Sequence, residues 1–162
     1  MGRRTLAAAC ALVALSVSSA AAQGDTFKAR LSRTPVENAN AALVTGSGSA
    51  TATLGGRTLM VRGSFEGMKS AATIAQIHLG PKGVRGPAIF DLTVAKGPAT
   101  GAGTIAGTFL LTPEQVEALR QSRFYIQIHS ESVPDGNLWG WLVPSEPGAA
   151  GGAGGPGGAA GK

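Results

Sequence analysis

The stretch Phe124–Leu142, FYIQIHSESVPDGNLWGWL, contains two alternating apolar runs separated by turn-forming residues. In the first run, Phe124–His129, Phe and Ile fall on one face and Tyr, Gln and His on the other, which is the period of two of a β-strand. Pro134-Asp135-Gly136 predicts a chain reversal, because proline presets φ and glycine accepts a positive φ. The second run, Leu138–Leu142, alternates leucine and glycine with two tryptophans. The stretch therefore predicts a β-hairpin.

The amino terminus has the features of a secretory signal peptide. Arg3 and Arg4 precede an apolar run over residues 6–17, and Ala20–Ala22 supplies small residues for cleavage. The run is shorter than the roughly 20 apolar residues that a membrane-spanning helix requires. We therefore expect residues 1–22 to be removed and the mature protein to be secreted or periplasmic, without a membrane span.

Removal of the leader would change both the cysteine content and the charge of the protein. Cys10, the single cysteine of the chain, lies in the leader, so neither a disulfide nor a thiol site is expected. The formal charge falls from +5 to +3 when Arg3 and Arg4 leave. The remaining lysines and arginines are scattered, unlike the basic clusters of nucleic-acid-binding proteins, and no nucleic-acid partner is expected.

The carboxyl terminus differs in composition from the rest of the chain. Residues 145–162 are rich in Gly, Ala and Pro, so they offer few side chains to bury and have much backbone entropy to lose. This composition predicts a disordered tail. Residues 23–144 have the size of one ordinary domain, and we expect a single folded unit there.

Further alternating runs predict strands throughout this domain, at residues 27–31, 48–54, 59–65, 74–79, 88–93 and 104–111. Gly55-Gly56 predicts a tight hairpin between two of them. Residues 112–115, TPEQ, predict the start of one short helix, because they combine a capping hydroxyl, a proline at the first helical position and a glutamine placed for a capping box. We therefore expect an all-β fold: a Greek-key β-sandwich, immunoglobulin-like or superoxide-dismutase-like, with one short connecting helix. An open barrel is the alternative.

A near-repeat occurs in two of the predicted strands. Gln76-Ile77-His78 and Gln127-Ile128-His129 both read Gln-Ile-His, both precede a glycine-containing loop, and they contain the only histidines of the chain. Within each strand Gln and His fall on one face. We expect Gln76, His78, Gln127 and His129 to form a ligand-binding or structural polar cluster, with both histidines at the same end of the fold.

Two interpretations of the histidines follow from their chemistry. Imidazole binds copper and zinc, so His78 and His129 are candidate metal ligands, although a tight site normally has three or four. The further ligands would come from Asp91, Glu131 or Asp135, and the spacing favours none of these. Alternatively, each histidine anchors its adjoining loop by a hydrogen bond to a backbone carbonyl. No other cofactor is expected.

Catalytic motifs are weakly represented. A histidine could act as a base toward Ser130 or Ser132, but the chain has no G-x-S-x-G nucleophile elbow. The glycine-rich stretches lack the lysine and the strand-to-helix context of a phosphate-binding loop. We therefore expect a protein that is not an enzyme.

Four segments together resemble the CHRD domain, which is named for chordin: residues 75–80 (AQIHLG), 86–92 (GPAIFDL), 125–130 (YIQIHS) and 136–140 (GNLWG). The resemblance extends from Phe27 to Val143. It implies an extracytoplasmic β-sandwich, and we expect a non-enzymatic binding or structural module of CHRD type. Its partner would be an extracytoplasmic protein or a cell-envelope component of unknown identity. The alternative is an extracytoplasmic copper- or zinc-binding protein that uses His78 and His129.

Overall fold

The computed structural model describes residues 24–35 and 41–145. The expected signal peptide, residues 1–22, and the expected tail, apart from Ser145, lie outside the described residues. The elements in chain order are β1 (Asp25–Arg33), β2 (Ser47–Gly55), β3 (Thr58–Glu66), β4 (Ala72–Leu79), β5 (Ala88–Lys96), β6 (Gly103–Leu110), α1 (Pro113–Arg120), β7 (Phe124–Ser130), β8 (Val133–Trp141) and β9 (Val143–Pro144). No helix among these residues is long and apolar enough to cross a membrane.

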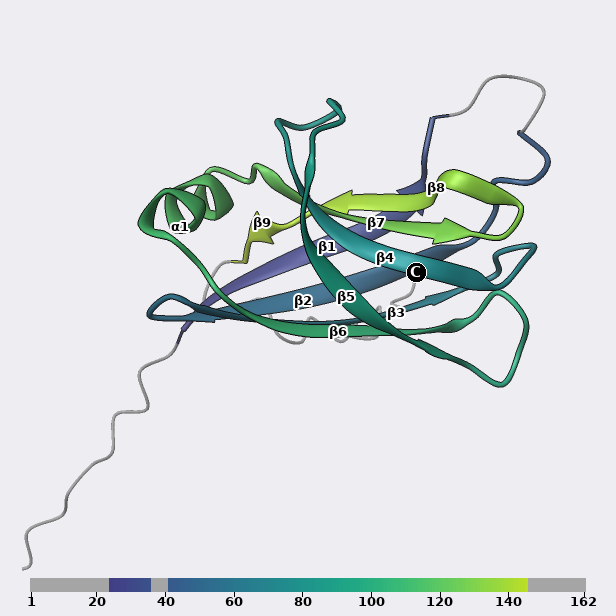
Figure 1. The fold of residues 1–162 in the computed structure, drawn as a ribbon, viewed down its shortest axis with the longest axis horizontal. Helices are drawn as coiled ribbons and strands as arrows, with labels where there is room; N and C mark the ends of the chain where they lie inside the picture. Colours follow the sequence, from purple (N-terminus) through teal and green to yellow (C-terminus); the bar gives the residue numbers. More distant parts are fainter. Residues whose placement is uncertain (1–23, 36–40, 146–162) are drawn as a thin grey trace, which may run out of the picture.

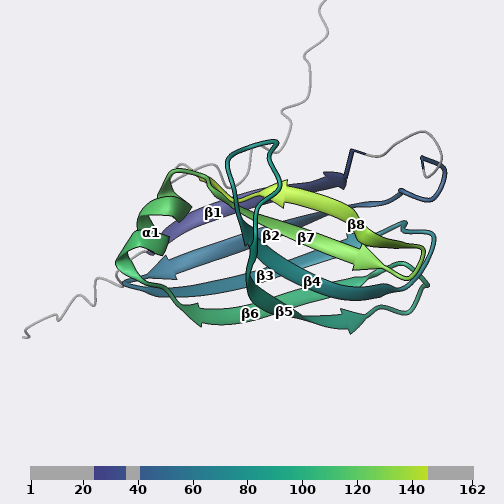
Figure 2. The same ribbon diagram turned by 45° about the horizontal axis from the view of Figure 1, so that its top comes forward.

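The strands form a closed barrel because β1 is hydrogen-bonded on both sides. It pairs antiparallel with β2 along Asp25–Leu31. On its other side it pairs with β8 through Ser32 and Arg33, and with β9 through Phe27 and Lys28. The eight long strands therefore close in the order β1-β2-β3-β6-β5-β4-β7-β8, and Figures 1 and 2 show the wall from two directions.

The expected Greek-key β-sandwich, in either its immunoglobulin-like or its superoxide-dismutase-like form, is wrong, and so is the open barrel. Alternation tells which residues face a core, but it does not tell which strands pair at the edges of a sheet. The interior rows mix small residues such as Ala29, Ala50 and Ala75 with large ones such as Phe27 and Ile77. This mixture lets the wall curl tightly while its side chains still fill the interior.

The predicted helix is confirmed. In α1, Thr112 is the N-cap, and its hydroxyl and the Gln115 side chain form the reciprocal hydrogen bonds of a capping box. Leu119 is fully buried in the core, with Val116 packed beside it. The helix connects β6 to β7 at one end of the barrel (Figure 1).

The chain reversal between β7 and β8 lies earlier than the sequence suggested. The turn is formed by Glu131 and Ser132, whereas Pro134–Gly136 belongs to β8. Between the paired positions Ile128↔Leu138 and Ser130↔Val133, β8 contains more residues than β7, so this segment forms a bulge. Proline suits the bulge because it lacks an N–H for the ladder, and glycine suits it because Gly136 has a φ of 117°.

Candidate functional site

The four predicted site residues lie on the outer face of the barrel wall. The inner face of β4 and β7 carries Ala75, Ile77, Ile126 and Ile128, so Gln76 and His78, like Gln127 and His129, face outward. Even so, every residue of β7 is buried. Trp141 and the first residues of β8, together with Gly86 from the β4–β5 loop, contact the outer face of the wall at this place.

The structure brings the two imidazoles together. Their ring centres are 6.5 Å apart, their planes differ by 30°, and each residue is only 9% exposed. They are not at equivalent strand ends, because β4 and β7 run antiparallel and His78 lies opposite Tyr125, four positions before His129. The two histidines thus lie together as expected, but their proximity comes from the pairing of β4 with β7 and from the side-chain directions, and not from equivalent strand ends.

Each histidine uses one ring nitrogen to hold a loop. His78 Nδ1–H donates to the carbonyl oxygen of Gly86 over 2.9 Å, and His129 Nδ1–H donates to that of Pro134 over 2.7 Å. A carbonyl oxygen can only accept, so the proton of the neutral ring is on Nδ1 and Nε2 carries a lone pair. This is the arrangement that the hydrogen-bonding interpretation predicts. It leaves Nε2 of both rings buried and without a hydrogen-bond partner among the described residues.

Burial keeps His78 neutral. Desolvation is the largest effect on its pKa and lowers it below the ordinary value, although the bond to Gly86 acts in the opposite direction. The positive charges that His129 and Arg85 can bring lower the pKa further. At neutral pH, His78 therefore presents a lone pair and not a proton at Nε2.

The two glutamines lie opposite each other in the β4–β7 pairing but bond different partners. Gln127 Nε2 donates to the carbonyl oxygen of Asp135 over 2.8 Å, and Gln76 Nε2 donates to the Asp91 carboxylate over 2.8 Å. Asp91 is therefore engaged with Gln76, and Asp135 supplies a backbone oxygen. In the described parts of the chain, no group of three or more His, Cys, Asp and Glu side chains is placed to hold a metal. The carboxylate ligands considered from the sequence are thus not assembled around the histidines.

Aromatic side chains border the histidine pair on one side. Tyr125 stacks on His78 with ring centres 4.9 Å apart, and Trp141 packs against Tyr125 at the same distance. Trp139 packs against Trp141 at 4.7 Å. Tyr125 was not selected as a site residue from the sequence, although it lies on the same alternating face as His129 and that pattern could have identified it.

The two histidines are bonded to the loop between β4 and β5 and to the bulge at the start of β8, and we call residues 80–87 together with residues 133–136 the cap. In Figure 1 the first loop stands out from the barrel between β4 and β5. Its base is held by the Tyr125 hydroxyl, which accepts from Gly86 N–H over 2.9 Å, and by Trp141 Nε1–H, which donates to the Gly80 oxygen over 3.1 Å. Arg85 Nη1 donates to the Asp135 oxygen over 2.9 Å and joins the two parts of the cap. No local sequence signal connects Arg85 with Asp135.

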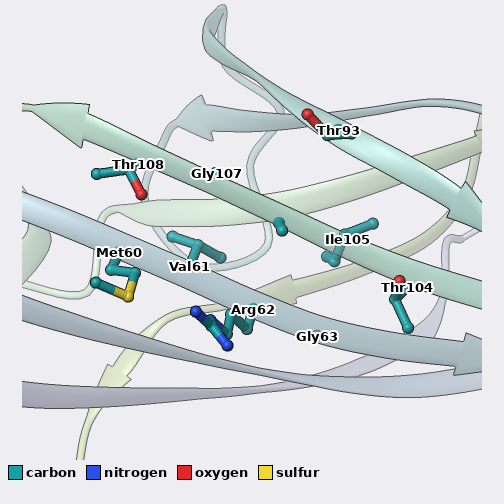
Figure 3. A pocket seen from close by; sticks show the side chains of 10 residues that line it. Met60, Val61, Arg62, Gly63, Thr93, Thr104, Ile105, Gly107 and Thr108 are labelled. Carbon is teal, nitrogen blue, oxygen red and sulfur yellow. The ribbon is translucent and has the colours of Figure 1, made fainter.

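A shallow depression also lies on the outer surface of β3 and β6, with Thr93 of β5 also lining it, and neither histidine-bearing strand contributes to it. Figure 3 shows Met60 and Arg62 from β3 and Thr104 and Thr108 from β6 along it. It contains no histidine or carboxylate. Its polar side chains are threonines and Arg62. The two unpartnered histidine nitrogens therefore form the better candidate site.

Comparison with protein families found that the CHRD domain model matches residues 27–142. Comparisons with curated proteins and with solved structures found no match. The matched range contains β1 from Phe27 onward, β2 to β8, α1, both histidines and both parts of the cap.

Proposed function

This chain belongs to the CHRD domain family, and from that premise we propose that it is an exported, non-enzymatic binding module whose ligand site is the histidine pair under the cap. One observation carries the proposal. Two neighbouring imidazoles present buried Nε2 lone pairs that meet no donor among the described residues. A buried polar atom without a partner is costly in a folded protein, so such a pair is best explained by a ligand that binds there.

The surroundings support binding rather than acid–base or nucleophilic chemistry. The Ser130 hydroxyl donates to Asn137 Oδ1 over 3.2 Å, while His129 Nδ1 is committed to Pro134. The backbone N–H of Ser132 is bonded to the hydroxyl of Ser70. The hydrogen bonds of the two histidines in the described residues go to Gly86 and Pro134, so neither serine hydroxyl is bonded to a histidine as a nucleophile is to its base.

A transition-metal ion is the class of ligand that the pair favours. A neutral imidazole with its Nδ1–H bonded to a backbone carbonyl is the usual form of a metal-binding histidine, because that bond fixes the tautomer and the ring orientation. Both rings have this form. Copper and zinc are the ions that imidazole suits.

The ligand proposal is tested by thermal unfolding and by long-range ¹H–¹⁵N spectra of the imidazoles in the presence of individual metal ions. We expect one of the ions to raise the melting temperature and to shift Nε2 of both rings. His129→Asn keeps a donor near the position of Nδ1 and removes Nε2, so it should abolish both effects. If no ion changes either measurement, the site does not bind a metal.

Turnover assays test the absence of catalysis. We expect no hydrolysis of ester, phosphoester, glycoside or peptide substrates by the purified protein. Turnover that is lost in His78→Asn or His129→Asn would show that the site is catalytic.

Export is tested by the mass of the protein recovered from the periplasm or medium of an expressing bacterium. We expect cleavage after Ala22, so that Gln23 becomes the first residue. Recovery of the full-length chain inside the cell alone would contradict export.

A further inference from the structure

We propose that the histidine pair binds one Cu(I) ion in two-coordinate form, between Nε2 of His78 and Nε2 of His129. This inference rests on the proposed function of the site as a metal-binding site and names the ion, its charge and its coordination. Three features of the site select Cu(I) over zinc and Cu(II): the separation of the rings, the number of donors, and the charge of the surroundings.

The separation of the ring centres is compatible with a nearly linear N–metal–N arrangement. A metal–imidazole bond is about 2 Å long, and the nitrogen lies roughly 1 Å from its ring centre, so a linear pair has ring centres about 6 Å apart. Two ligands of a tetrahedral ion, with a smaller angle at the metal, would bring the centres to about 5 Å. The observed separation is 6.5 Å, closer to the linear value.

The number of donors also favours Cu(I). Structural zinc sites have four protein ligands, and the described residues gather only two around this point. The candidate carboxylate Asp91 is bonded to Gln76, and the backbone oxygens of the cap already accept bonds from the histidines and from Gln127. Cu(I) has a filled d shell and is stable with two nitrogen donors in a line, so it needs no third ligand.

The charge of the surroundings points the same way. No described carboxylate joins the pair, and Arg85, whose guanidinium is bonded to the Asp135 oxygen of the cap, adds positive charge nearby. The cost of burying an ion rises with the square of its charge, so a divalent ion costs about four times as much as a monovalent ion of equal size. A site that is buried, aromatic and without acid groups therefore favours a monovalent ion.

The site is prepared for the ion before it arrives. The bonds from Nδ1 to Gly86 and Pro134 orient both rings, and Tyr125 packs against the face of one. The Nε2 atoms are out of contact with solvent, so bound copper would be shielded from water and dissolved oxidants. Entry of the ion then requires a transient opening of the cap.

The affinity is measured without oxygen, by competition between the purified protein and a coloured Cu(I) chelator. Cys10→Ser is used as the parent chain, because an unprocessed leader would contribute a thiol that itself binds Cu(I). We expect one Cu(I) per chain. His78→Asn and His129→Asn should each weaken binding by more than about 100-fold, since each removes one of two ligands while keeping a donor for the loop.

Met60→Leu is the matched control, because Met60 is an exposed soft ligand on the outer face of β3. It should leave the affinity for Cu(I) unchanged. X-ray absorption of the copper-loaded parent should show two imidazole nitrogens and the intense edge feature of linear two-coordinate Cu(I). Circular dichroism of each variant establishes that it is folded.

The outcomes separate this inference from the proposed function. If zinc or Cu(II) binds at the pair more tightly than Cu(I), or if the absorption spectrum shows three or four donors, the ion is misassigned although the site still binds a metal. If each single variant keeps half of the bound copper, the histidines bind independently and the bridged site is wrong. If no metal binds at all, both the inference and the proposed metal site fail.

Discussion

At the scale of the residue, the two nitrogens of each histidine ring have different roles: Nδ1 is hydrogen-bonded within the fold, and Nε2 is the proposed ligand atom. Nδ1 of each ring belongs to the fold, because it holds a carbonyl of the cap. Nε2 belongs to no contact among the described residues. A histidine can therefore be buried and hydrogen-bonded through one ring nitrogen and still have a second nitrogen free of protein contacts.

His78 should make stability depend on pH. Its folded-state pKa lies below the value of 6.5 that applies to the unfolded chain, so as the pH falls the unfolded chain takes up the proton first. The contribution of neutral His78 to the free energy of unfolding is fully present above pH 6.5. It is lost as the pH falls from that value through the lower pKa of the folded state. Urea unfolding between about pH 8 and about pH 5 should show this loss in the wild type.

His78→Asn should lose less stability over the same pH range, because asparagine does not titrate. His129, Tyr125 and Arg85 are the titratable or charged groups beside His78, and they are retained in the variant. An equal loss in both proteins would show that His78 is not the group responsible.

Gly86 is a residue at which no side chain fits. A Cβ there would collide with the backbone oxygen of Leu79, and the peptide groups of Gly86 bond both Tyr125 and His78. Gly86→Ala should lower the free energy of unfolding by about 2 kcal/mol or more. Gly55→Ala is the control, since a Cβ at Gly55 meets nothing within 4 Å, and it should change stability by less than about 0.5 kcal/mol. Equal effects in chemical denaturation would contradict the close packing of the cap.

At the scale of the element, the cap consists of the β4–β5 loop and the bulge of β8, joined by Arg85. Its bond to the Asp135 oxygen is exposed, so Arg85→Ala should lower the free energy of unfolding by less than about 1 kcal/mol. The local opening of the cap should nevertheless become more frequent. Hydrogen exchange of the Gly86 amide, which is bonded to Tyr125, should accelerate.

Lys82→Ala provides the comparison, because Lys82 is an exposed residue of the same loop. In the Lys82→Ala variant, the rate of hydrogen exchange at the Gly86 amide should match that of the wild type. If Arg85→Ala also leaves that exchange unchanged, Arg85 does not hold the cap.

At the scale of the whole molecule, closure at β1 determines stability. Leu31 is fully buried where β1 meets β2, and it also lies next to Gly140 of β8. Leu31→Ala should lower the free energy of unfolding by about 2–5 kcal/mol, because the closed wall cannot collapse into the space left. Leu110→Ala, at a position 68% exposed, should change it by less than about 0.5 kcal/mol. If urea denaturation gives similar free energies of unfolding for the two variants, the barrel is not tightly packed where β1 joins β2 and β8.

The sequence by itself determined the local structure and the chemistry of the site. Alternation in β4 places Gln76 and His78 on the same face of the strand, and alternation in β7 does the same for Gln127 and His129. Residues 112–115, TPEQ, start α1. These features depend on residues a few positions apart, through the geometry of the strand and of the helix N-terminus. The family follows from the same local segments, as the match over residues 27–142 confirms.

Only the tertiary structure decided how these pieces meet. The closure of the barrel depends on β1 pairing with β2 and with β8, which starts about a hundred residues later, and such pairings are set by how all the interior side chains pack together. The same packing forms the bulge at Pro134–Gly136 and places its carbonyl beside His129. The unpartnered Nε2 atoms exist because antiparallel pairing of β4 with β7 brings two distant histidines under one cap.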